Sequence, residues 1–307
     1  MSLVTHAMRR RDLVTLLAAA VAWAGLWQIR QARGEDASAD AKQREMQNVS
    51  RLFASIHWQK GPCNAELGTV ATIRVPEGFM FTGREGARAW AELTHNPPND
   101  RCLGVFMPAA MSGWFLVFDY DDVGYVKDDE KDRLDADQLL TNLKAATERS
   151  NQYRRSKGWT DLSLTGWEYP PHYDDSIKRL VWAVRFQSAG ESGVNYNIRV
   201  LGRGGVMRVN LVTEPARLAQ DVLATHKVLD GFIFKEGQRY AEWHAGDRVA
   251  EYGLAGLIAG GGTAVAAKLG LLAYLGKFLA KLWYLVLAAA GGVVAWFKRL
   301  FARRESV

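Results

Sequence analysis

Helical spacing of apolar residues predicts four helices in the middle of the chain. In each case a capping residue or a helix breaker marks an end of the periodic segment. The predicted helices are residues 41–56 with Asp40 as N-cap, a short helix opened by the capping box Thr82-x-x-Glu85 with Trp90 and Leu93 facing inward, a long helix from the cap Asp135 to about Lys157, and a last helix between Pro215 and Gly231.

Alternation of apolar and polar residues predicts strands between these helices. The predicted strands are residues 70–75, 103–108, 114–120, 162–167, 180–186, 194–200 and 206–212. Consecutive strands are joined by turn sequences, such as Ser112-Gly113 and the Gly-rich residues 202–205. We therefore expect an α+β fold, with an antiparallel β-sheet flanked by helices, over residues 40–250.

The N-terminal segment, residues 1–39, has the pattern of an export signal. Three arginines, residues 9–11, precede an uncharged apolar run from Leu13 to Ile29, and Ala37-Ser38-Ala39 resembles a cleavage site. Arg30 and Arg33 after the apolar run instead favour a retained signal anchor. Both interpretations predict a domain outside the cytoplasm.

The C-terminal residues have the pattern of a membrane anchor. Residues 278–297 form an apolar run interrupted only by Lys281, long enough for a transmembrane helix. The basic tail, residues 298–307, is typical of the cytoplasmic side. Residues 251–277 are also apolar and rich in glycine, which predicts an interfacial segment or a second membrane segment. Together with the N-terminus, this predicts a bacterial inner-membrane protein whose main domain faces the periplasm or the outside.

Charge excludes one class of partner. The net charge of +6 comes from the two ends, +4 in residues 1–33 and +6 in residues 268–307, so the body between them carries −4. An acidic body lacks the cationic surface that nucleic-acid binding needs, and we expect no nucleic-acid partner. The expected partners are the lipid bilayer and an envelope protein or peptide.

An acidic segment offers one candidate metal site. Residues 119–137 contain nine carboxylates. Asp119, Asp121 and Glu130 occupy ligand positions of a calcium loop, but Val123 and Lys127 stand where two further ligands belong. The alternative is a solvated connection whose acids cap the next helix. We favour that alternative and expect no cofactor.

Residues 167–174 concentrate aromatic, histidine and acidic side chains in what we interpret as one rigid turn with two prolines. Trp167, Tyr169 and Tyr173 are candidate binding residues. An envelope hydrolase is the alternative hypothesis, and it requires the four candidate catalytic residues to meet in one cleft. These candidates are Asp121, Asp122, His172 and Asp174.

The hairpin of residues 194–212 offers a second candidate surface. Alternation places Val194, Tyr196, Ile198 and Val200 on one face of the hairpin. The other face carries Asn195, Asn197, Arg199, Arg208 and Asn210, a set able to bind an anionic or peptide ligand, although such faces are often only solvated.

Cys63 and Cys102 are the only cysteines, and in an exported domain they are able to form one disulfide. The sequence contains no nucleophile-elbow, P-loop or dinucleotide-binding motif.

Long motifs along the body resemble a known family. These include VPEGFMF, THNPPNDRCLG, WFLVFDYDDVGYVKDDEKDRLDADQLL, GWEYPPHYD, RLVWAVRF, VNYNIRVLGRGGVMRVNLV and RYAEWHAGDRVAEYGLAGLIAGG. Together they resemble a bacterial domain of unknown function found in predicted membrane-anchored proteins, over about residues 55–300. The resemblance implies an envelope protein and no activity, cofactor or catalytic residue. The body also resembles, at the level of fold, photosystem-accessory and nuclear-transport-regulator proteins.

We therefore expect a membrane-anchored cell-envelope protein whose body is a non-enzymatic binding or accessory module.

Overall fold

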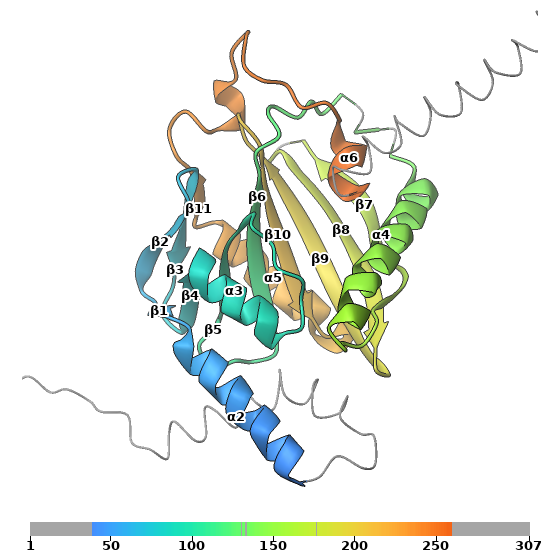
Figure 1. Ribbon diagram of the computed structural model, residues 1–307. Helices are drawn as coiled ribbons and strands as arrows, with labels where there is room; N and C mark the ends of the chain where they lie inside the picture. Colours follow the sequence, from blue (N-terminus) through green and yellow to red (C-terminus); the bar gives the residue numbers. More distant parts are fainter. Residues whose placement is uncertain (1–38, 130, 133, 176, 260–307) are drawn as a thin grey trace, which may run out of the picture. The chain divides into compact units, whose positions relative to one another are not determined.

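The computed structural model describes residues 39–259, apart from residues 130, 133 and 176. Its fold is α+β, with a large antiparallel sheet flanked by helices, as predicted (Figure 1). The helices are α2 (Ala39–Ser55), α3 (Arg84–Leu93), α4 (Ala136–Ser156), α5 (Leu218–Leu229) and α6 (Leu254–Ala259), with 3-10 helices η1 (Pro215–Arg217) and η2 (Tyr240–Glu242).

Eight strands form the large sheet, in the order β1-β4-β5-β6-β10-β9-β8-β7, and all neighbours are antiparallel. They are β1 (Gln59–Lys60), β4 (Phe79–Gly83), β5 (Cys102–Pro108), β6 (Phe115–Asp121), β7 (Ser163–Asp174), β8 (Arg179–Ser188), β9 (Glu191–Leu201) and β10 (Val206–Thr213). A second sheet has the order β11-β3-β2, with β2 (Cys63–Leu67), β3 (Ala71–Val75) and β11 (Phe232–Phe234).

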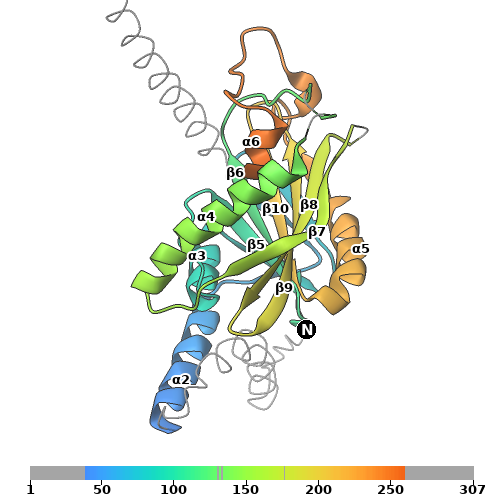
Figure 2. The same cartoon turned by 90° about the vertical axis from the view of Figure 1, so that its right-hand side faces the viewer.

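The helices divide between the two faces of the large sheet. Figure 2 shows α3 and α4 on one face and α5 on the other. On the α5 side, which we call the closed face, apolar side chains of the large sheet pack against the second sheet and α5 in the main hydrophobic core. Val194, Tyr196, Ile198 and Val200 of β9 all belong to this core, so the predicted apolar side of the hairpin is confirmed.

A smaller core fixes α3 on the opposite face. Ala87, Trp90 and Leu93 are the buried residues of α3, at helical spacing, and they pack with apolar side chains of α2, β4, β5 and β6. The inward direction of Trp90 and Leu93 is confirmed. The predicted capping box is wrong, because the N-cap is Gly83 without a side-chain cap bond, and Thr82 is a buried residue of β4.

Four strands were not expected from the pattern, namely β1, β2, β4 and β11, and with them the second sheet. The segment of residues 167–174, interpreted as a turn, forms the greater part of the edge strand β7. The pairing of β7 with β8 shifts register three times, and the last shift includes Pro170 and Pro171. Prolines are tolerated in an edge strand at such irregular positions because they have no amide hydrogen to donate.

The structure does not join the two cysteines. Cys63 and Cys102 are free, on strands of different sheets.

The predicted membrane anchor at residues 278–297 lies outside the described residues, as does nearly all of the predicted signal at residues 1–39. Of the predicted interfacial or second membrane segment, residues 251–277, only residues 251–259 are described, and they include α6. Within residues 39–259, apart from the three gaps, none of the helices has the length and apolarity needed to cross a bilayer.

Candidate functional site

Strand register places the predicted polar residues on one face of the sheet. Arg208 of β10 pairs with Asp119 of β6 and with Arg199 of β9, and Asn210 pairs with Asn197. Because side chains alternate along a strand, these residues share the face opposite the main core. The shared face is therefore confirmed. We call it the groove face.

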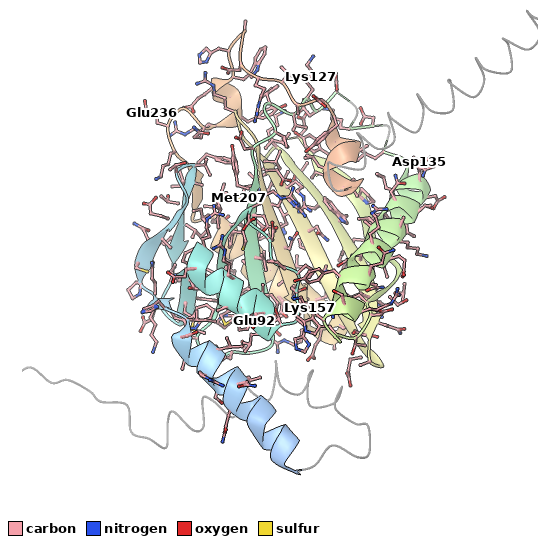
Figure 3. The ribbon with its side chains drawn as sticks, viewed as in Figure 1. Glu92, Lys127, Asp135, Lys157, Met207 and Glu236 are labelled. Carbon is pink, nitrogen blue, oxygen red and sulfur yellow. The ribbon has the colours of Figure 1, made fainter. Side chains whose placement is uncertain are left out.

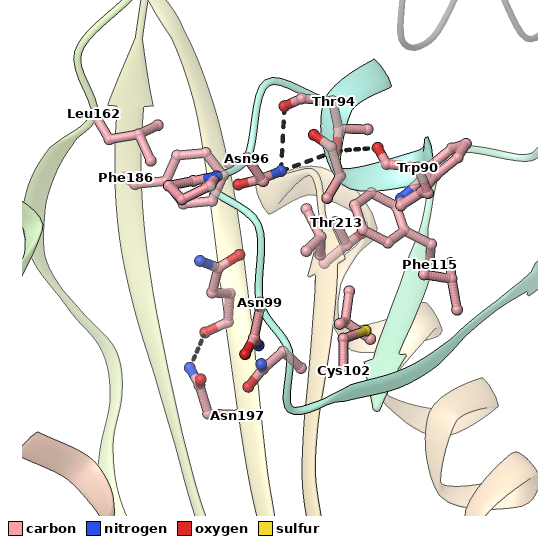
Figure 4. A pocket seen from close by; sticks show the side chains of 18 of the residues that line it. Trp90, Thr94, Asn96, Asn99, Cys102, Phe115, Leu162, Phe186, Asn197 and Thr213 are labelled. Atoms are coloured by element: carbon pink, nitrogen blue, oxygen red, sulfur yellow. Dashed lines mark hydrogen bonds between the residues drawn. The ribbon is translucent and has the colours of Figure 1, made fainter. Parts of the chain in front are cut away.

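The groove face is the floor of a cavity of about 1050 Å³, which we call the groove. Ala87, Trp90 and Ala91 of α3 line one side, and Arg154 of α4 with the β8–β9 turn lines the other. Residues 94–101, which we call the strap, lead from α3 to β5. Figure 4 shows the strap crossing in front of the strands between Asn96 and Asn99.

The strap is held at several points. Asn96 donates a backbone hydrogen bond to Ala91 O, 2.7 Å, which ties it to α3. The His95 ring stacks on Trp159 just after α4, with the centroids 5.0 Å apart. Arg101 at the far end pairs with Asp121 of β6, 2.9 Å. A second cavity, of about 530 Å³, lies against the strap between α2, α3 and the end of α4. Its lining includes Glu92 and Lys157, labelled in Figure 3.

Five asparagines line the groove, two from the strap and three from the floor. They are Asn96, Asn99, Asn195, Asn197 and Asn210. Apolar side chains alternate with them, among them Phe186 of β8. Phe186 lies over Gly193 of β9, where a Cβ atom would stand 2.3 Å from the ring. Glycine is thus required at this point in the wall of the groove.

Charged groups of the floor are only partly paired, because Asp119 Oδ1, Arg199 Nε and Arg208 Nε are buried without a hydrogen-bond partner in the described part of the chain. Arg199 is buried, lies over the Trp182 ring at 4.4 Å and donates to Asn210 Oδ1, 3.1 Å. Burial, and after it the nearby charge of Arg208, lower the pKa of Arg199 well below its usual value. Arg208 Nη1 lies 3.6 Å from Asp121 Oδ2. These contacts restrain the side chains of Arg199 and Arg208 on the floor.

Cys102 is the one thiol in the lining of the groove. Burial, assisted by the charge of Asp119, raises its pKa to about 12. A thiol with that pKa stays protonated at neutral pH, and only the thiolate is a strong nucleophile. Cys102 is therefore a packing residue of the groove wall.

Arg154 was not singled out by the sequence. Its side chain is only 1% exposed. Nε donates to Thr160 O, 2.6 Å, and Nη1 donates to His95 O of the strap, 2.7 Å. Nη2 is enclosed and has no hydrogen-bond partner. Burial lowers the pKa of Arg154. In sequence this residue resembles any helix-end arginine, so only its surroundings distinguish it.

The candidate catalytic residues do not meet. Asp121 ends β6, whereas His172 and Asp174 lie on β7, and β10, β9 and β8 separate the two strands. Four strand spacings amount to roughly 19 Å along the sheet. Asp122 is exposed and ion-paired with Arg248. The arrangement required by the hydrolase hypothesis is thus not present in the structure.

The aromatic candidates point in different directions. Trp167 Nε1 donates to Ala136 O at the start of α4, 3.2 Å, whereas Tyr169 is half-exposed and its ring approaches Tyr196 on the closed face. Tyr173 is buried and donates to Asp128 Oδ2, 3.0 Å. These three side chains do not form a single aromatic patch.

The calcium candidates face cations. Asp119 and Asp121 are both buried on the groove face, and Arg101 and Arg208 contact Asp121. Glu130 lies outside the described residues. In the part of the chain that the structure describes, no group of three or more histidine, cysteine, aspartate or glutamate residues is placed to hold a metal ion.

Comparison with known proteins gives one family match. The family described as "Protein of unknown function (DUF2167)" matches residues 59–291. No curated protein matches the chain significantly.

Solved structures show distant similarities. The solution structure of cyanobacterial PsbP (CyanoP) from Synechocystis sp. PCC 6803 is 13% identical, with 59% of this chain and 94% of that chain covered and a TM-score of 0.34. The crystal structure of the Saccharomyces cerevisiae Ran-binding protein Mog1p is 13% identical, with 58% of this chain and 96% of that chain covered and a TM-score of 0.29. These similarities concern the fold alone.

Proposed function

The chain belongs to the DUF2167 family of proteins of unknown function, and from that premise we propose that its body is a non-enzymatic module that binds an extended peptide segment in the groove. The observation that carries the proposal is the lining of five asparagines among apolar side chains. Each side-chain amide both donates and accepts hydrogen bonds, as each peptide group of a ligand does. The apolar lining supplies places for ligand side chains.

The charges of the groove also suit a peptide. Three arginines and three acids line it, namely Arg88, Arg154, Arg208, Asp119, Glu191 and Glu214. A balanced lining does not select a highly charged polymer. The protonated thiol of Cys102 and the separation of Asp121 from His172 favour binding over reaction chemistry.

We further propose that residues 278–297 anchor the protein in the bacterial inner membrane, with the domain on the outer side. The support for this is the apolar run with its basic tail at the C-terminus, together with the export-type N-terminus. The bilayer and an envelope peptide or protein are then the two partners.

Binding can be tested with the full chain in detergent micelles and a random dodecapeptide library. The matched variants are Ala216→Trp and Ala219→Trp, because both alanines are exposed and only Ala216 lines the groove. We expect Ala216→Trp to weaken the binding of the selected peptides at least tenfold, and Ala219→Trp to change their affinity less than twofold. Equal effects of the two variants, or an absence of selected peptides, would refute the proposal.

Topology has its own test. Alkaline phosphatase fused after residue 250 should be active, and a fluorescent protein fused after residue 307 should be fluorescent. Inactive phosphatase at residue 250 would place the domain in the cytoplasm and overturn the proposed location.

A further inference from the structure

Two neighbouring arginines near the end of α4 have opposite surroundings. Arg155 is half-exposed and forms ion pairs with Asp161, 2.6 Å, and Glu148, 2.8 Å. Arg154 is 1% exposed, and among the described residues no carboxylate lies within ion-pair distance of it. Its two hydrogen-bond acceptors are backbone carbonyl groups, of Thr160 and His95.

A buried guanidinium with no carboxylate within ion-pair distance is an uncommon arrangement, and the charge of Asp161 acts on Arg154 only from farther away. Burial of an ion disfavours its charged form unless an opposite charge or several hydrogen bonds compensate. Arg154 retains one enclosed nitrogen, Nη2, without any acceptor, and the residue lines the groove. The guanidinium therefore has one unused donor next to the proposed binding site.

We propose that Arg154 binds a carboxylate of the ligand, so that the groove selects a peptide bearing one carboxylate at this end. The inference rests on the proposed function. One guanidinium balances one monoanion, and the rest of the lining, with two arginines and three acids, has no excess positive charge to offer a dianionic phosphate. Nη2 is covered in this structure, so binding includes a local shift of the strap, which Arg154 Nη1 holds through His95 O.

The test uses peptides selected from the library, resynthesised in three forms. The first has its acidic side chains and a free C-terminus, the second has an amidated C-terminus, and the third is amidated with every acid replaced by its amide. With the unaltered full chain, removal of the recognised carboxylate should weaken binding about 10- to 100-fold, the range of a hydrogen bond between charged groups. The second form shows whether that carboxylate is terminal or belongs to a side chain.

Variants identify the residue responsible. Arg154→Gln should abolish the preference for the carboxylate, so that the acidic and neutral forms bind this variant with affinities within twofold of each other. Arg155→Gln, the matched control, should leave both forms within twofold. Detectable binding of the neutral form shows that the groove of Arg154→Gln still forms.

Two outcomes would overturn the inference without contradicting the proposed function. One is equal affinity of the acidic and neutral forms for the unaltered chain, a comparison that stands even if Arg154→Gln does not fold. The other is an acid preference that Arg154→Gln leaves unchanged. If no peptide is selected, or if Ala216→Trp and Ala219→Trp have equal effects, the proposed function itself fails.

Discussion

The two faces of the large sheet use adjacent residues of the same strands differently. On the closed face, Phe118, Val209 and Ile198 form one cross-strand row, and each is 0% exposed. On the groove face, the next row contains Val117, Asn210 and Asn197, which line the groove. A step of one residue along each strand leads from the main core to the candidate site.

Because of this difference, we expect the closed face to determine the stability of the fold and the groove face to determine ligand binding. Burial of apolar surface is the dominant favourable term in folding, and the closed face supplies much of it. The groove face keeps amides and charges that a tightly packed interface would exclude or pair completely. Substitutions on the closed face should therefore lower the free energy of unfolding, and substitutions on the groove face should change the affinity for the ligand.

The largest effect should come from Phe118→Ala on the closed face. Loss of a fully buried ring should lower the free energy of unfolding by about 3–5 kcal/mol. Val117→Ala, one residue away and partly exposed on the groove face, should cost about 1 kcal/mol. Urea unfolding of the full chain measures both. Similar losses from the two substitutions would contradict the division between the faces.

A smaller effect should appear at alkaline pH through Cys102. Burial raises the pKa of its thiol from the ordinary 9.0 to about 12. The unfolded chain therefore loses this proton first, so the contribution of Cys102 to stability is complete below pH 9 and declines as pH rises toward 12. We expect a loss of about 2 kcal/mol between pH 9 and pH 11.

Cys102→Ala isolates that contribution from other groups that titrate in the same range. Its free energy of unfolding should fall less steeply above pH 9 than that of the unaltered chain. Parallel pH profiles for the two proteins would show that the thiol is not the group responsible.

Asp135→Ala should have an effect of about 1 kcal/mol on the free energy of unfolding. Asp135 Oδ1 accepts a hydrogen bond from the backbone N–H of Gln138, 3.0 Å, which caps α4 beside the groove. Asp137→Ala, in the same first turn, removes only a favourable interaction with the helix dipole and should cost about 0.3–0.5 kcal/mol. Thermal unfolding of the two variants measures this difference. An equal loss of stability in both would argue against a specific capping role of Asp135.

Asn197→Ala should lower the free energy of unfolding only slightly. Its amide donates one neutral hydrogen bond, to Asn195 O, 2.9 Å, and the side chain is partly exposed, so we expect a loss of about 0.5 kcal/mol. The same substitution should weaken peptide binding measurably. A stable variant with unchanged affinity would remove Asn197 from the proposed site.

Local patterns predicted most elements of the fold. The alternation in residues 194–212 correctly assigned both faces of the β9–β10 hairpin, because side-chain direction in a strand depends only on its period of two. Asp135 was identified as a cap because its hydrogen bond spans three residues. In contrast, β1, β2, β4 and β11 escaped prediction. β1 and β11 have only two and three residues, and β11 is defined by its pairing with β3, distant in the chain.

For the candidate site, too, the sequence predicted local features and missed those that depend on tertiary packing. Asn195, Asn197 and Arg208 were found from the hairpin, but the strap and Arg154 were not, because their approach to the floor depends on how α3 and α4 pack. The segment Trp167–Tyr173 looked like one binding turn because aromatic residues and prolines cluster in it. Pairing with β8 made it an edge strand and directed Trp167 and Tyr169 to different neighbours.

The sequence by itself determined the α+β class, the polar face of the hairpin and the apolar and basic pattern of the two ends, because each depends on residues close together in the chain. Only the tertiary structure decided which polar residues share a cavity. Arg154 and Arg155 show this most directly, since two identical neighbours differ in burial and in hydrogen-bond partners. One turns inward under the strap and the other faces solvent with two acids, because a helix directs consecutive side chains to different sides.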